Sequence, residues 1–103
     1  MRPLVVPPAA LRDENSIQML SAWIAERGLH CTLNIGFFEQ QGHKEPKAWG
    51  MLLADVVKHI ANACKEVSGV STPETIQRIL DSMNEELEDS TSAAEGKFVE
   101  RPS

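Results

Sequence analysis

The segment that decides the fold is residues 49–64, WGMLLADVVKHIANAC. Apolar residues recur here every three or four positions, which is the spacing of an amphipathic helix. Two apolar stripes lie side by side: one contains Trp49 and Ile60, and the other, made of smaller residues, contains Ala54 and Ala61. A helix with two apolar stripes is buried against two elements. We therefore expect this helix at the centre of the fold, packed on a strand and on another helix.

The ends of this central helix are marked by proline and glycine. Glu45-Pro46 is a suitable beginning, because proline fits the first turn of a helix. Gly69 is suited to the left-handed residue that follows a last turn, so we expect the helix to end at Val67 or Ser68.

A further helix is predicted after the central one. Residues 71–74, Ser-Thr-Pro-Glu, form a helix-start signature in which either hydroxyl could be the cap. Apolar residues continue at helical spacing to about Leu87. From Asp81 to Asp89 the chain has five acids and no base. Such a run is usually a solvated surface, and the alternative is a docking surface for a basic protein partner.

The clearest strand signal lies between residues 29 and 37, where apolar and polar residues alternate. Ahead of it, apolar residues at helical spacing predict a helix from about Arg12 or Glu14 to Arg27, with Gly28 as its stop. Residues 3–7 read as a short edge strand or extended arm, followed by a double proline that rules out a helix directly after it.

These elements predict a small two-layer α+β domain in the order strand, helix, strand, helix, helix, with a minimal sheet packed on three helices. The strand at 29–37 would pair in parallel with residues 3–7, or with a short return strand after Phe38. We expect one compact domain over residues 1–89 and a disordered tail over 90–103. An open sheet edge invites a second subunit, so self-association into a homodimer is a further expectation.

Charge and composition exclude several classes of partner. The net charge is -5: residues 1–50 have five bases and five acids, and residues 51–103 have five bases and ten acids. Such a chain has no basic patch for nucleic acid or for an anionic membrane surface. No apolar run is long enough to span a bilayer, and no secretory signal is recognisable. The two cysteines fit a reducing cytoplasm.

The candidate polar cluster is on the central helix and consists of Asp55, Lys58, His59 and Asn62. Asp55 and His59 are four residues apart and therefore meet on one helix face. A carboxylate that orients an imidazole is what a general base needs, but no nucleophile is aimed at this pair. The simpler interpretation is a solvated helix face, so no residue is assigned a catalytic role.

Three aromatic residues, Trp23, Trp49 and Phe38, are candidates for an interface or the rim of a pocket, and core packing is the simpler interpretation for both tryptophans. The three histidines and two cysteines lack the spacing of metal ligands, so neither a metal nor a cofactor is expected. Cys31 and Cys64 are interpreted as buried free thiols.

The motif Trp49-Gly50-x-x-Leu53-x-Asp55-x-x-Lys58-His59-x-Ala61-x-Ala63 resembles that of a family of short uncharacterised bacterial proteins with a domain of unknown function. A weaker element of the resemblance is Leu20-x-x-Trp23. The resemblance implies a bacterial cytoplasmic setting and draws attention to Asp55 and His59. The function expected from the sequence is a non-enzymatic interaction or regulatory homodimer. The alternative is a small-molecule binding domain, or an enzyme that uses the Asp55/His59 pair.

Overall fold

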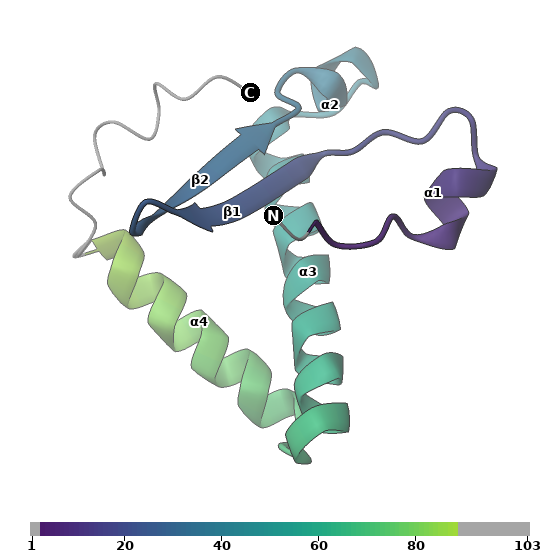
Figure 1. Cartoon of the computed structure of the whole chain (residues 1–103). Helices are drawn as coiled ribbons and strands as arrows, with labels where there is room; N and C mark the ends of the chain where they lie inside the picture. Colours follow the sequence, from purple (N-terminus) through teal and green to yellow (C-terminus); the bar gives the residue numbers. More distant parts are fainter. Residues whose placement is uncertain (1–2, 89–103) are drawn as a thin grey trace. The chain divides into compact units, whose positions relative to one another are not determined.

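The computed structural model describes residues 3–88, so the predicted tail at 90–103 lies outside the described residues (Figure 1). The elements are α1 (Pro8–Arg12), β1 (Leu20–Ala25), β2 (Gly28–Leu33), α2 (Phe37–Gln40), α3 (Glu45–Ser68) and α4 (Thr72–Glu88). The predicted α+β class with a minimal sheet is confirmed. The described residues divide into two units, 3–35 and 36–88. Packing of the sheet on the helices stays a prediction.

The first unit is built around an antiparallel hairpin of β1 and β2, with Leu20 opposite Leu33 and Ala25 opposite Gly28. Glu26 and Arg27 form the turn and have φ of 50° and 65°. Two successive residues at positive φ are typical of a type I′ turn, whose twist matches that of the flanking strands. A loop of two residues therefore closes the sheet.

The two faces of the hairpin differ in character. Directly opposed residues of an antiparallel pair project from the same face. One face is therefore wholly apolar and consists of Leu20, Ala22, Ile24, Leu29, Cys31 and Leu33. The other face has Ser21, Thr32, Trp23 and His30 near its centre. On the apolar face the side chain of Ile24 is 86% exposed.

The predicted helix from Glu14 to Arg27 is wrong, because residues 20–25 form β1. Helical spacing and strand alternation coexist in this segment: Leu20 and Ile24 fit a helix, and Leu20, Ala22 and Ile24 also alternate along a strand. Pairing with β2 decides between them, because tertiary contacts override a weak local preference. Gly28, the expected helix stop, is instead the first residue of β2.

Of the two alternatives for residues 3–7, the edge strand is wrong and the extended arm is not contradicted: these residues form no regular element, and β2 pairs with β1 in antiparallel fashion. The expectation that no helix follows the double proline is wrong as well, because a short helix, α1, begins at Pro8. The double proline permits this because the first residues of a helix need no N–H partner. β2 ends at Leu33, short of the predicted Phe37.

Both long helices begin and end as the sequence predicts. α3 is followed by Gly69 at φ 74°, whose N–H donates to the carbonyl oxygen of Lys65 at 2.9 Å. α4 is capped by Ser71, since the Ser71 Oγ accepts a hydrogen bond from the Glu74 N–H at 3.3 Å. The structure thereby selects the serine over the threonine as the cap.

The second unit has its core where α3 packs on α4. Val57 and Ala61 of α3 and Thr75 of α4 are buried, and the Thr75 Oγ1 donates to the carbonyl oxygen of Ser71 at 3.1 Å. The stripe of smaller residues thus faces α4, which confirms one of the two predicted packing partners. On the other stripe Ile60 is 44% exposed. Figure 1 shows α3 and α4 diverging from their short connection. Within residues 3–88, no helix combines the length and apolarity needed to cross a bilayer.

The strained turn generates a testable prediction. Replacing Arg27 by Gly should raise the free energy of unfolding by up to about 1 kcal/mol, because glycine adopts positive φ without the penalty of a Cβ. Arg27→Ala is the matched control, since it removes the same side chain and keeps the strain. Urea denaturation of the two variants measures the difference, and equal midpoints would contradict a strained turn.

Candidate functional site

The sequence-predicted polar cluster lies along the exposed side of α3. The Asp55 Oδ2 and His59 Nε2 atoms are 3.3 Å apart, and the two side chains are 68% and 78% exposed. Lys58 and Asn62 lie on the same helix and are also exposed. An exposed pair of this kind contributes little, because water screens the charges and the long side chains lose freedom. The geometry is that of a solvated helix surface.

The three aromatic candidates fall into different units. Trp23 lies on β1, not on a helix, and its indole Nε1 donates to the Ser21 Oγ at 2.9 Å. Phe38 of α2 and Trp49 of α3 are brought together edge to face, with ring centroids 5.6 Å apart at 87°. Phe38 is half-buried against this indole, so its ring is a packing residue of the second unit.

The side chain of Glu45, which the sequence analysis did not single out, joins α2 to the start of α3. The Glu45 Oε1 accepts hydrogen bonds from the Trp49 Nε1 at 2.9 Å and from the Gly36 N–H at 3.2 Å. The Glu45 Oε2 accepts a third hydrogen bond, from the Glu39 N–H at 2.9 Å. One side chain at the start of α3 therefore holds both the indole of Trp49 and the first turn of α2.

The Glu45 carboxylate replaces a cap that α2 lacks. Gly36 is the cap residue of α2, with φ of 98°, and has no side chain to accept the free N–H groups of the first turn. An anion at this end of a helix is also favoured by the helix dipole. Partial burial raises the pKa of Glu45, but hydrogen bonds from Gly36, Glu39 and Trp49 outweigh it, so the pKa lies below the ordinary value.

Sequence reasoning could have found part of this arrangement. Glu45 and Trp49 are four residues apart at the start of a helix, which places their side chains on one face. The contact to Gly36 depends on the path of the loop between α2 and α3, and no local pattern encodes that path. Both oxygens of the Glu45 carboxylate accept hydrogen bonds from within the chain, so we interpret this side chain as structural.

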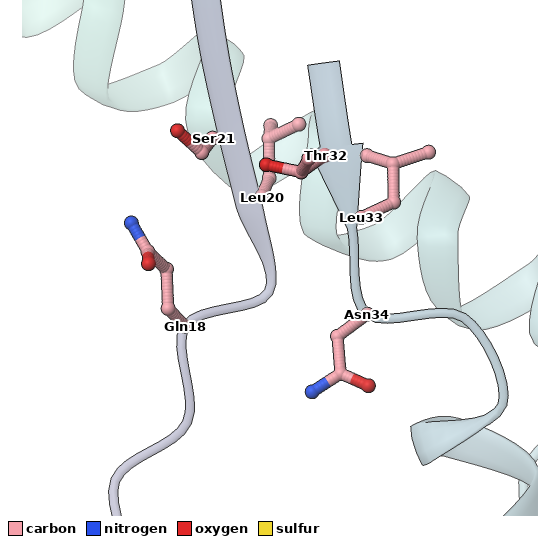
Figure 2. A pocket seen from close by; sticks show the side chains of 6 residues that line it. All are labelled: Gln18, Leu20, Ser21, Thr32, Leu33 and Asn34. Atoms are coloured by element: carbon pink, nitrogen blue, oxygen red, sulfur yellow. The ribbon is translucent and has the colours of Figure 1, made fainter. Parts of the chain in front are cut away.

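Two surface cavities formed by described residues could take a ligand. One has a volume of about 240 Å³ and lies at the open end of the hairpin, lined by Gln18, Leu20, Ser21, Thr32, Leu33 and Asn34 (Figure 2). The other, of about 440 Å³, lies between α3 and α4 and is lined in part by Cys64, Arg78 and Met83. Neither is lined by the Asp55/His59 pair.

Cysteine and metal chemistry receive no support from the described residues. Cys31 and Cys64 are free and half-buried, which agrees with free thiols but places them less deeply than expected. Among residues 3–88 no three His, Cys, Asp or Glu side chains are grouped so that they could hold a metal ion.

The fold and these surface features define a class: a small α+β protein with a two-stranded hairpin and a helical pair, in which the Asp55/His59 pair lines neither of the two cavities described above. The chain belongs to the family described as a domain of unknown function (DUF5076), which matches residues 3–91. A similar solved structure is described as "a putative pyruvate dehydrogenase" from the photosynthetic bacterium Rhodopseudomonas palustrus CGA009. It is 26% identical, has a TM-score of 0.66, and the match covers 91% of both chains. No curated protein matches the sequence significantly.

The Glu45 carboxylate should make the second unit sensitive to acid. Because hydrogen bonds lower the pKa of Glu45 in the folded protein, the stabilising effect of the ionised carboxylate is present above the ordinary value of 4.5 and is lost as the pH falls through the lower folded value. In a Trp23→Phe background, fluorescence of Trp49 should change across this range. Glu45→Gln should abolish that acid transition. At neutral pH it should also weaken the contacts that join Gly36, Glu39 and Trp49. An identical transition in the Gln variant would contradict the assignment.

The Asp55/His59 pair should be nearly neutral for stability. Asp55→Ala is expected to lower the free energy of unfolding by no more than about 0.5 kcal/mol, the usual contribution of an exposed pair four residues apart on a helix. Urea denaturation of the variant and of the wild-type protein, at pH 6 and at pH 8, measures this difference in the free energy of unfolding. A loss several times larger would show that the pair is held in a site rather than in solvent.

Proposed function

We propose that this protein is a non-enzymatic interaction or regulatory protein that acts as a homodimer in the bacterial cytoplasm. The observation that carries the proposal is the amount of apolar surface left uncovered. Within residues 3–88 the buried hydrophobic residues are Val57 and Ala61, whereas Ile24 and Val67 are 86% and 87% exposed. A face on which apolar side chains gather, as Leu20, Ala22, Ile24 and Leu29 do on the hairpin, is typical of a site of association.

The state of the polar residues supports an interaction role over catalysis. A general base needs a hydrogen-bonded neighbour and a substrate position within reach, in surroundings that shift its pKa toward its task. Asp55 and His59 contact each other but are mostly exposed, and the two cavities lie elsewhere. The activity in the description of the similar structure is therefore not part of the proposal.

The acidic end of α4 suggests the kind of protein partner. Arg78 is engaged with Glu74 at 2.7 Å, so the base of this helix is already paired within the chain. Asp81, Glu85 and Glu88 are exposed beyond it. Acidic groups at the negative end of a helix dipole are locally unfavourable, and a basic partner would relieve this cost. Neither nucleic acid nor an anionic membrane is attracted by such a surface.

Native mass spectrometry of the untagged protein is the test. We expect a mass of twice 11.4 kDa without an adduct over a range of protein concentrations. A species of 11.4 kDa at every concentration would contradict the homodimer. A monomer that carries extra mass would favour the alternative, a small-molecule binding domain, and would direct mutation first to the two cavities and to Asp55 and His59.

A further inference from the structure

The free edge of β1 can be located from the hydrogen bonding of the hairpin. The Asn34 N–H donates to the Met19 carbonyl oxygen at 3.0 Å, so these two residues form a hydrogen-bonded pair just beyond the strands. Hydrogen-bonded and non-hydrogen-bonded pairs alternate along an antiparallel ladder. In the register of this hairpin, Leu20, Ala22 and Ile24 therefore belong to non-hydrogen-bonded pairs. Their N–H and C=O groups point away from β2.

These outward groups have no sheet partner among the described residues, because β1 pairs with β2 alone. The edge also lacks the usual protection against further pairing, since β1 has no charged residue and no proline. Its last four residues are exposed. A two-stranded sheet is marginal by itself, and added strands would stabilise it.

The edge of β2 is less suited to pairing. β2 begins with Gly28, which weakens a strand, and has the ionisable His30 near its middle. Two of its six residues are exposed, against four of six in β1. β1 has neither glycine nor an ionisable side chain and places Trp23, a residue type enriched in interfaces, beside the free edge.

We propose that two copies of this chain join antiparallel through their β1 edges, with Ala22 of one copy directly opposite Ala22 of the other. This inference rests on the homodimer proposed above and specifies its interface. It produces a four-stranded sheet in the order β2, β1, β1, β2. The occupant of the edge is a second copy because an identical strand presents the same outward groups at the same spacing.

The register follows from matching the outward groups. Pairing around Ala22 places Leu20 opposite Ile24 of the second copy, so all three outward residues of each strand enter hydrogen-bonded pairs. A shift by one residue would oppose outward groups to inward ones and would place the apolar face of one copy beside the polar face of the other. A shift by two residues would leave one outward residue of each β1, either Leu20 or Ile24, without a partner in the other copy's β1. The centred register also continues the apolar face across all four strands.

Two edge prolines test the interface. Ala22→Pro removes an outward N–H of β1 that the hairpin does not use, and edge strands tolerate proline at such positions. It should raise the dissociation constant of the dimer more than about tenfold in sedimentation equilibrium, because the central pair loses both its N–H donors. Cys31→Pro makes the matched change on the outer edge of β2 and should leave the dimer intact. Circular dichroism checks that both variants fold.

Disulfide trapping gives a second measurement that does not depend on proline. In a background without Cys31 and Cys64, Ala22→Cys should form a covalent dimer on mild oxidation, because the Cα atoms of a hydrogen-bonded pair lie about 5.5 Å apart. Ile24→Cys is the matched control on the same face. Its two copies would be offset by about 13 Å along the strands, beyond the reach of a disulfide.

The outcomes separate this inference from the homodimer itself. A dimer that survives Ala22→Pro, or one lost only in Cys31→Pro, would overturn the β1 interface and leave the homodimer standing. Crosslinking at Ile24→Cys equal to that at Ala22→Cys would overturn the register. A wild-type protein that stays at 11.4 kDa at all concentrations would overturn both proposals.

Discussion

The sheet of this protein depends on the need to pair the backbone groups of β2. A strand with one apolar face cannot leave its N–H and C=O groups unsatisfied, and the chain provides a partner across a turn of two residues. Glu26 and Arg27 take positive φ at this turn, although neither is glycine or asparagine. The pairing of six residues on each side outweighs the local strain. Because this pairing uses only one edge of each strand, the outer edges of β1 and β2 have no sheet partner among the described residues. The β1 interface is inferred from this.

The second unit depends on a different device, a single carboxylate shared between two helices. Glu45 begins α3, and its oxygens accept hydrogen bonds from the first turn of α2 and from the indole of Trp49. The packing of Phe38 on Trp49 is therefore held at both rings, since α2 fixes one and Glu45 the other. Farther along α3, Ala61 is fully buried at the contact with α4. Polar capping therefore acts at the start of α3, and apolar packing acts farther along the same helix, at its contact with α4.

The sequence predicts the helical half well and the hairpin half poorly, for physical reasons. α3 and α4 are long, strongly periodic and bounded by signals such as Gly69 and Ser71, which act locally. β1 carries two periodicities at once, and only pairing with β2 selects the strand. For the candidate site, the Asp55/His59 contact followed from spacing on a helix. The role of Glu45 did not, because the Gly36 N–H reaches it through the path of the chain between α2 and α3.

The short connections of this chain have a consequence for the order of folding. Two residues join β1 to β2, and three residues, 69–71, join α3 to α4. The entropy of closing such short loops is small, and contacts between neighbours in sequence form quickly. The hairpin and the helical pair can therefore each nucleate without waiting for the rest of the chain. In a nascent chain the hairpin would emerge first, with its apolar face and its β1 edge already available to another copy.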